Sequence, residues 1–301
     1  MSNTRDASKV VTKHQAEHSI VLNKSLHEIE LEVWSQRAAD YDAVFASIST
    51  QAIPDMLDSL GELKGKKHLD VACGTGHLVA AASQRRASGE GVDFAEPMVE
   101  IARVLYPNNV FRTADATQLP YDNFSFDAVT CAFGLSHIED SQAAVDEAYR
   151  ILKPGGHFAF TLWFDAENGN ELFQIVNDAF ARFITVPLTL PGSWTRLRFA
   201  NIQDCEAITR RSGFSAPIFK KLPIVQEVVT APLIVALFEK ISVRSKIILD
   251  RQPRSVQQQI QEYILSKVEA LRRNGIIRLA WPALLTVVQK PVAAGDSHVN
   301  P

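Results

Sequence analysis

The chain has little cysteine, and its cysteines are not arranged for metal or disulfide chemistry. Three cysteines, Cys73, Cys131 and Cys205, occur among 301 residues, and no two of them form a Cys-x-x-Cys pair. This spacing predicts neither a metal centre nor a disulfide framework. Unpaired cysteines in apolar segments are typical of a reducing compartment, so we expect a cytoplasmic protein whose cysteines serve as small packing residues.

The chain also lacks a long apolar run and an excess of basic residues. No stretch reaches the ~18 consecutive apolar residues of a membrane span, and the polar N-terminal segment has no signal-peptide core. The 31 Lys and Arg residues face 34 Asp and Glu residues, for a formal net charge of -3. A nucleic-acid surface needs a concentrated basic patch. We therefore expect no membrane span, no nucleic-acid partner, and a small molecule as substrate.

The apolar residues that are present are sufficient for one large core. They make up 46% of the sequence, and the length suits one core with a helical cap. Strand-like and helix-like segments alternate in the first half, which predicts a parallel sheet with helices on both faces. The expected strands are 67–72, 89–94, 109–113, 126–132 and 157–164, and the expected helices between them are 77–86, 97–105 and 141–152.

The remaining segments are predicted from composition and periodicity. Polar residues without a sustained period predict flexible tails over 1–18 and 293–301. Residues 19–60 are expected to form N-terminal cap helices, 61–165 the cofactor-binding core, and 166–292 a helical lid with the remaining strands of the same domain. Within the last segment we expect a helix over 172–183, a strand near 217–225, helices over 233–247 and 255–273, and a final strand over 283–289. The helices over 233–247 and 255–273 are open to two interpretations, a lid or the surface of a homodimer.

A glycine loop follows the first strand of the predicted core. The strand ends in Ala72-Cys73, and Gly74-Thr75-Gly76 leads into a helix. Glycine has no Cβ, so the backbone can turn sharply and bring its N–H groups close to a ligand. The N-terminus of the following helix favours an anionic or polar ligand at the same place. The loop therefore predicts a nucleotide-binding turn, although an ordinary strand-to-helix turn would need the same residues.

Three acids fall near the carboxyl ends of the first three strands of the core. In open parallel sheets ligands bind at this edge. Asp93 ends the second strand, where a carboxylate can accept from both hydroxyls of a ribose that has no 2′-phosphate. Asp115 follows the third strand and could accept from an adenine amine, or cap a turn. Phe94 and Met98 supply an apolar surface for the ring, and Asp70 lies within the first strand.

The order of these motifs resembles the class I S-adenosylmethionine-dependent methyltransferases. Within that class it is similar to the ubiquinone/menaquinone-biosynthesis-like small-molecule group, with its methyltransferase type 11 domain. The resemblance covers about residues 34–164 and rests on Leu69-Asp70-Val71-Ala72-Cys73-Gly74-Thr75-Gly76, Gly91-Val92-Asp93-Phe94-Ala95-Glu96-Pro97-Met98, Asp115-Ala116, Phe126-Asp127-Ala128-Val129 and Leu152-Lys153-Pro154-Gly155-Gly156. It implies a Rossmann-like, doubly wound α/β fold with a mostly parallel seven-stranded sheet and an antiparallel last strand. Ala72 departs from a common glycine, and Ala95 from a helix-capping residue.

The same resemblance implies a cofactor and its site. The cofactor would be S-adenosyl-L-methionine and the product S-adenosyl-L-homocysteine. Asp70 and the glycine loop would hold the amino-acid end, Asp93 the ribose, and Asp115 with Ala116 the adenine. Trp34 and Tyr41 would close over the sulfonium, or would simply pack on the apolar face of their helix. The predicted cofactor-binding residues are Trp34, Tyr41, Asp70, Ala72, Gly74, Gly76, Asp93, Phe94, Met98, Asp115, Ala116 and Phe133.

Catalytic and acceptor-binding residues are predicted from position. His137 follows the fourth strand and is the side chain best placed to take a proton, although a loop histidine with a structural role would look the same. Trp163, Trp194 and Phe199 either line an apolar acceptor pocket or hold the 171–200 insertion on the sheet. The expected acceptor is a small, largely apolar molecule, aromatic or of secondary metabolism, methylated on oxygen, nitrogen or carbon.

Three other functions are weighed against this one. An NAD-dependent oxidoreductase would share the glycine loop and Asp93, but Val79 stands where its third glycine belongs. A nucleic-acid methyltransferase would have an Asn/Asp-Pro-Pro-Tyr/Phe motif where this chain has Cys131-Ala132-Phe133-Gly134. A protein that keeps the methyltransferase fold without methyl transfer, as a pericyclic or elimination catalyst or as a binding partner, stays open.

Overall fold

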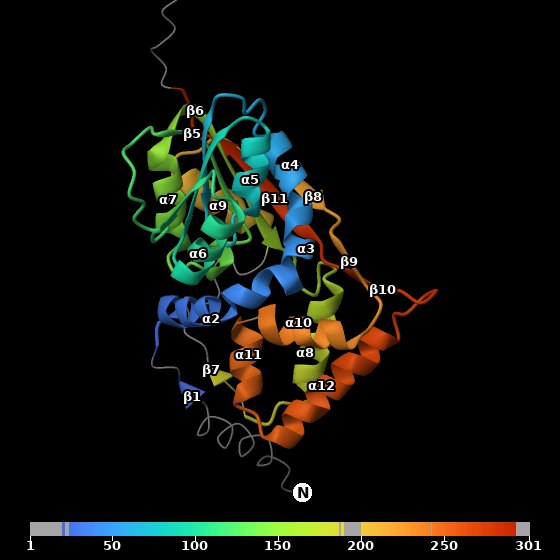
Figure 1. The fold of residues 1–301 in the computed structure, drawn as a ribbon. Helices are drawn as coiled ribbons and strands as arrows, with labels where there is room; N and C mark the ends of the chain where they lie inside the picture. The colour runs from blue at the N-terminus through green and yellow to red at the C-terminus, as the bar shows by residue number, and fades with distance from the viewer. Residues whose placement is uncertain (1–19, 22–23, 187, 190–199, 242, 293–301) are drawn as a thin grey trace, which may run out of the picture.

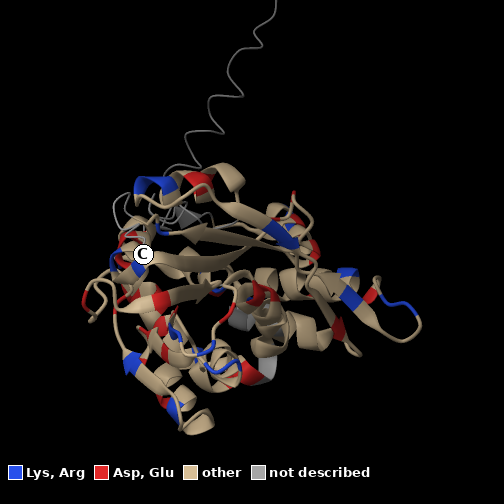
Figure 2. Cartoon of the chain, turned by 90° about the horizontal axis from the view of Figure 1, so that it is seen from above, with Lys and Arg blue, Asp and Glu red and all other residues tan. Residues whose placement is uncertain are grey.

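The computed structural model describes residues 20–21, 24–186, 188–189, 200–241 and 243–292. A sheet with its surrounding helices occupies the upper half of Figure 1, and a group of helices occupies the lower half. Helix α2 (Leu26–Tyr41) lies between the two. Figure 2 shows acidic and basic residues interspersed along the cartoon. In the part of the chain that the structure describes, no helix is long and apolar enough to cross a membrane.

The main sheet has seven strands in the order β4-β3-β2-β5-β6-β11-β8. Their bounds are β2 Lys67–Val71, β3 Ser88–Asp93, β4 Val110–Thr113, β5 Phe126–Ala132, β6 Leu152–Trp163, β8 Ile218–Leu222 and β11 Ala283–Gln289. The strands from β4 to β6 pair in parallel, and β11 is antiparallel to both β6 and β8. This confirms the predicted Rossmann-like fold. From β2, the strands β3 and β4 are added on one side and β5 and β6 on the other, so the strand order reverses between β2 and β5. Sheets of this kind bind ligands at this switch point.

Helices connect the parallel strands largely where the sequence predicts them. They are α5 His77–Gln84, α6 Glu96–Leu105 and α7 Ser141–Ile151, and a further helix, α9 Ile202–Arg211, precedes β8. Asp140 caps α7 by accepting from the N–H of Ala143. Strand β6 starts earlier than predicted because Phe126 already pairs with Leu152, and the ladder resumes at Ala128 and His157 after an irregularity.

The N-terminal cap is one helical run with a change of winding in its middle. Helix α2 begins with a capping box in which Ser25 and Glu28 satisfy each other's backbone N–H groups. A π-helical segment η1 (Asp42–Ala46), α3 (Ser47–Ser49), a 3₁₀ turn η2 (Thr50–Ala52) and α4 (Ile53–Ser59) then follow without a break. A two-residue strand β1 (Ile20–Val21) pairs in parallel with β7 (Leu188–Thr189).

The lid segment differs from prediction in three places. Instead of one helix over 233–247 there are two, α10 (Pro232–Ile241) and α11 (Val243–Asp250), beside α8 (Glu171–Phe183) and α12 (Arg254–Glu269). Instead of one strand near 217–225 there are two as well, because Pro223, which has no N–H to donate, separates β8 from β9 (Val225–Val228). Strand β9 pairs with β10 (Ile277–Ala280), a strand that the sequence did not predict.

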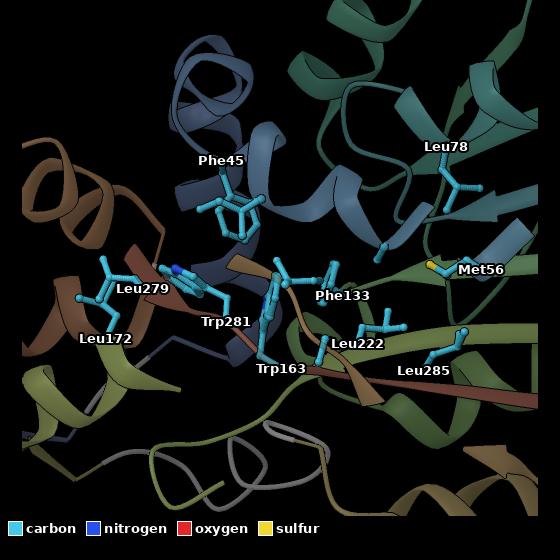
Figure 3. Close-up of a cluster of buried hydrophobic side chains, with 14 of the residues drawn as sticks. Phe45, Met56, Leu78, Phe133, Trp163, Leu172, Leu222, Leu279, Trp281 and Leu285 are labelled. Atoms are coloured by element: carbon cyan, nitrogen blue, oxygen red, sulfur yellow. The ribbon is translucent and has the colours of Figure 1, made fainter. Parts of the chain in front are cut away.

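The largest hydrophobic cluster joins the sheet to the lid. Figure 3 shows it as a continuous group that includes Phe133 and Trp163 of the sheet, Phe45 of the cap, and Leu172 and Trp281 of the lid segment. Trp281 and Leu172 are each only 1% exposed. This packing supports the proposal that residues 166–292 belong to the same domain as the core.

Candidate functional site

A cavity lies at the carboxyl ends of β2, β3, β4 and β5, beneath side chains of α2, α8 and α11. It brings together most of the residues that the sequence predicts for the site. Those lining it are Trp34, Tyr41, Ala72, Gly74, Asp93, Phe94, Met98, Asp115, Ala116, Phe133, His137 and Trp163. Trp194 and Phe199, predicted to contact the acceptor, lie outside the described residues.

Two predicted cofactor contacts do not reach this cavity. Asp70 is only 1% exposed, and its Oδ1 accepts a 2.7 Å hydrogen bond from the Thr130 hydroxyl beneath the glycine loop. Burial raises the pKa of Asp70 to about 7. Gly76 has a φ of +88°, and a Cβ on it would lie 2.7 Å from Cζ of Phe111. Asp70 therefore belongs to the base of the site, and Gly76 lets the turn pack against Phe111.

Asp93 connects the second strand to the glycine loop. Its Oδ2 accepts from the Gly74 N–H at 2.9 Å, and its Oδ1 accepts from the Ala95 N–H at 3.0 Å. The residue is 6% exposed, and burial raises its pKa, although both N–H groups act in the opposite direction. A carboxylate oxygen can accept more than one hydrogen bond. Asp93 thus keeps acceptor capacity toward the cavity that it lines.

The glycine loop leaves open space beside Asp93. Gly74 has a φ of +51°, and the nearest atom to a Cβ built on it would be Cε1 of Tyr41, at 3.9 Å. Tyr41 comes from the end of α2 and is partly buried, and this burial raises the pKa of its hydroxyl to about 12. The loop and the aromatic ring above it therefore form a slot with a peptide floor and an apolar roof.

At two strand ends beside the slot, a residue other than glycine adopts the left-handed backbone conformation. Ala72, after β2, has a φ of +56°, and Phe133, after β5, has a φ of +60°. This conformation costs about 1–2 kcal/mol for residues with a Cβ, so the surrounding packing must impose it. The ring of Phe133 stacks on Trp163 with centroids 3.8 Å apart and planes at 7° (Figure 3). Phe45 adds an edge contact to Trp163, so this wall of the cavity is aromatic.

Asp115 caps a turn and also lines the cavity. Its Oδ1 accepts from the backbone N–H and the hydroxyl of Thr117, both at 2.8 Å, so it does cap the turn after β4. It also lines the cavity next to Ala116. Phe94 lies close by, in edge contact with His27 of α2. The end of the cavity near β4 therefore has one carboxylate and two rings.

A buried carboxylate that the sequence analysis missed orients His137. Glu30 is 4% exposed, and its Oε2 accepts from Nε1 of Trp34 at 2.8 Å and lies 3.0 Å from Nδ1 of His137. The Trp34 ring packs edge-on against His137 with centroids 5.0 Å apart. Among the described residues only Glu30 hydrogen-bonds the imidazole, and does so through Nδ1, which leaves Nε2 available. The one signal in the sequence was the spacing of Glu30 and Trp34, four residues apart on one helix face.

A second acid attaches the cap to the core. Asp42, in the π-helical segment, accepts through Oδ1 from the Thr75 hydroxyl at 2.6 Å, and the same atom lies 3.0 Å from Nε2 of His77. Nδ1 of His77 in turn lies 2.7 Å from the hydroxyl of Tyr106. The end of α2 is thereby joined to the start of α5, and this places Tyr41 over the glycine loop.

The lid completes the cavity with apolar side chains, two polar ones, Asn177 and Ser245, and the cation Arg244. Phe173 and Val176 come from α8, and Val243 and Arg244 come from α11. In the ranges that the structure describes, no group of three or more His, Cys, Asp or Glu side chains is arranged to hold a metal ion.

Comparison with known proteins shows which family the core of the chain is similar to. A family model described as a methyltransferase domain matches residues 69–160. Demethylmenaquinone methyltransferases of Clavibacter sepedonicus and of Staphylococcus aureus (strain MRSA252) are 41% identical to this chain over 101 and 107 residues. Residues 69–160 therefore match a methyltransferase domain, as the order of the sequence motifs predicts. These matches cover 33% and 34% of this chain, and 41% and 44% of the two relatives, less than half of their length.

Solved structures extend the likeness beyond the methyltransferase domain's motifs. YcgJ of Bacillus subtilis superposes with a TM-score of 0.55 at 20% identity, over 80% of this chain and 99% of that one. Phosphoethanolamine N-methyltransferase 2 of Haemonchus contortus, solved with phosphomonomethylethanolamine and S-adenosylhomocysteine, gives 0.57 at 18% identity, over 89% and 60% of the two chains. At these identities the likeness shows the fold.

Proposed function

We propose that this protein transfers the methyl group of S-adenosylmethionine to an oxygen, nitrogen or carbon atom of a small, largely apolar acceptor in the cytoplasm. The observation that carries the proposal is the position of Asp93. Its buried carboxylate is held by the Gly74 and Ala95 N–H groups at the edge of a cavity whose other wall is aromatic. One cavity thus offers both a nucleoside contact and an acceptor surface.

The residues present fit the adenosyl group of the proposed cofactor. Each oxygen of Asp93 already has one backbone donor and can accept one ribose hydroxyl in addition. Phe94 and Met98 would flank the adenine, and Asp115 has a second oxygen, Oδ2, to accept from its amine. The open space at Gly74 suits close approach of the amino-acid end. When bound, the cofactor supplies a methyl group made electrophilic by its sulfonium.

The chain's own contribution to methyl transfer is to position the acceptor and to exclude water. The cavity walls have to hold the attacking atom of the acceptor at a distance of about 3–3.5 Å from the methyl carbon. Phe133, Trp163 and Val176 offer an apolar surface for the acceptor body, and Trp34 and Tyr41 cover the reacting region.

His137 is the proposed proton acceptor. Nε2 of His137 would take the proton that the acceptor's nucleophile loses on methylation. Glu30 would hold the imidazole through Nδ1 and stabilise the imidazolium that forms. Glu30 acts here as a positioning residue, because its carboxylate oxygen is engaged by Trp34 and by the imidazole of His137.

Two measurements in sequence test the proposal. Titration calorimetry with S-adenosylhomocysteine should show binding at micromolar levels, and absence of binding would contradict the cofactor assignment. Incubation with deuteromethyl-labelled donor and a panel of phenols, aromatic acids and amines, followed by mass spectrometry, should show gain of one labelled methyl. Tight cofactor binding with no labelled product across the panel would favour the fold without methyl transfer.

A further inference from the structure

Arg244 is the cation of the cavity. It lies in α11 and lines the cavity between Val243 and Ser245. The side chain is partly buried, and burial lowers the pKa of its guanidinium. Among the described residues, no hydrogen bond and no ion pair involves Arg244. Its neighbour Lys246, two residues along the same helix, is instead paired with Asp250 at 2.6 Å.

A partly buried guanidinium that has no protein partner among the described residues is stabilised by a ligand that pairs with it. The group has five N–H donors in a planar fork that matches a carboxylate or another oxyanion. Removing such a charge from water without a partner costs free energy, and a bidentate anion recovers it with strong hydrogen bonds. The facing helix α8 contributes the apolar Phe173 and Val176 to the cavity, and its polar residue there, Asn177, carries a neutral amide that cannot balance the charge.

The acids of the cavity already have other partners. Glu30 is occupied by Trp34 and His137, Asp93 by two backbone N–H groups, and Asp115 by Thr117. Each pairing uses groups of the cap or of the strand ends. Among the described residues that line the cavity, Arg244 is the Lys or Arg side chain that remains for an incoming anion.

We propose that the acceptor carries an anionic group, a carboxylate or similar oxyanion, which pairs with Arg244 while its apolar body lies on Phe133 and Trp163. This inference rests on the proposed function and names the substrate class. Arg244 belongs to the lid, together with Phe173 and Val176, and not to the glycine loop or the strand ends that would hold the cofactor. The anion is therefore assigned to the acceptor and not to the carboxylate of the cofactor.

The test compares two aromatic probes that differ in one anionic group. They are 8-anilinonaphthalene-1-sulfonate and its neutral counterpart N-phenyl-1-naphthylamine, titrated into the full chain with saturating S-adenosylhomocysteine. Arg244→Gln should weaken binding of the sulfonate probe by about 10- to 150-fold, the loss expected for one charge-assisted pair. Binding of the neutral probe should stay unchanged. Arg244→Lys, which keeps the charge without the fork, should fall between.

Lys246→Gln is the matched control, because it removes the same charge from the same helix outside the cavity lining. It should bind both probes as the unmodified protein does. Equal affinity of Arg244→Gln and the unmodified protein for the sulfonate probe would overturn the proposal. So would an Arg244→Gln variant that loses affinity for S-adenosylhomocysteine instead, since the cation would then serve the cofactor. Absence of S-adenosylhomocysteine binding in the unmodified protein would be a failure of the proposed function itself.

Discussion

Glu30 and His137 stand 107 positions apart in the chain, and Oε2 of Glu30 lies 3.0 Å from Nδ1 of His137. The contact joins the cap helix to the loop after the fourth parallel strand, the 3₁₀ turn η3 (Leu135–His137). Trp34 donates to the same carboxylate oxygen, so the imidazole, the indole and the acid form one connected group. A carboxylate that holds one ring nitrogen sets which nitrogen faces the ligand.

This pairing predicts separate effects on turnover and on cofactor binding. His137→Gln should lower turnover by about 100-fold or more, the usual contribution of a positioned base. Glu30→Gln keeps the acceptor oxygen but loses the charge that stabilises the imidazolium, so its loss should be smaller. Steady-state rates with the acceptor identified by labelled methyl transfer would measure both.

The dissociation constant of S-adenosylhomocysteine is the control for both variants. It should change by less than about threefold, which is a smaller free energy than the loss of one charge-assisted hydrogen bond. Unchanged turnover in His137→Gln would remove the histidine from the chemistry. A Glu30→Gln variant with a larger loss than His137→Gln would show that the acid acts on something besides the imidazole.

Asp93 should control affinity for the cofactor. Asp93→Ala removes the acceptor for one or two ribose hydroxyls and also leaves the Gly74 and Ala95 N–H groups without their partner. We expect calorimetry to show S-adenosylhomocysteine binding weaker by about 10- to 150-fold. Asp122→Ala removes an acid from the exposed turn before β5 and should bind normally. Equal affinities of the two variants would refute the role of Asp93.

The buried chain His68–Thr130–Asp70 should make stability depend on pH in two opposing ways. Nε2 of His68 lies 2.9 Å from the Thr130 hydroxyl, which donates to Asp70. Burial raises the pKa of Asp70 from 3.8 to about 7, so the folded state holds a proton that the unfolded state releases, and stability falls as pH rises through this window. Burial lowers the pKa of His68 from 6.5 to about 4, so its contribution is lost as pH falls.

Variants should separate these two contributions. Relative to the unmodified protein, Asp70→Asn should gain free energy of unfolding as pH rises from 4 to 7, with a slope of up to about 1.4 kcal/mol per pH unit. His68→Gln should gain as pH falls from 6.5 to 4. Urea denaturation at several pH values measures both differences. A difference that stays constant with pH for either variant would contradict the assigned titration.

Gly134 should resist substitution for a purely steric reason. Its φ of -75° suits any residue, but a Cβ would lie 2.5 Å from Cβ of Ala72 and 2.9 Å from Sγ of Cys131. We expect Gly134→Ala to lower the free energy of unfolding by about 1–3 kcal/mol, the usual cost of overpacking. Ala72→Gly alone should be close to neutral, because relief of its left-handed strain offsets the added entropy of the unfolded chain.

The double variant Ala72→Gly/Gly134→Ala tests whether the clash with Ala72 causes the loss of stability in Gly134→Ala. It should recover part of the lost stability, because the closest clashing atom is gone while the Cys131 contact remains. Thermal unfolding of the four proteins gives the coupling energy. Strictly additive losses would mean that the two Cβ atoms do not meet.

Local patterns in the sequence were sufficient for the sheet, the glycine loop and the positions of Asp93 and Asp115. Repeated strand–helix units put the carboxyl ends of parallel strands at one edge, so residues at those ends come together whatever the details of packing. The same patterns locate Asp70 along a strand, but they do not say whether its side chain reaches the cavity or lies beneath the loop.

Only the tertiary structure decided the pairing of Glu30 with His137, the Asp42 link to α5, and the presence of Arg244 in the cavity. Each depends on how the cap and lid helices pack on the sheet, and helical periodicity predicts that a face is buried without saying against what. The pairing of β9 with β10 has the same origin, since those strands are distant in the chain and meet only after the lid has folded. Contacts between distant segments arise from the summed packing of the whole core, which no local pattern encodes.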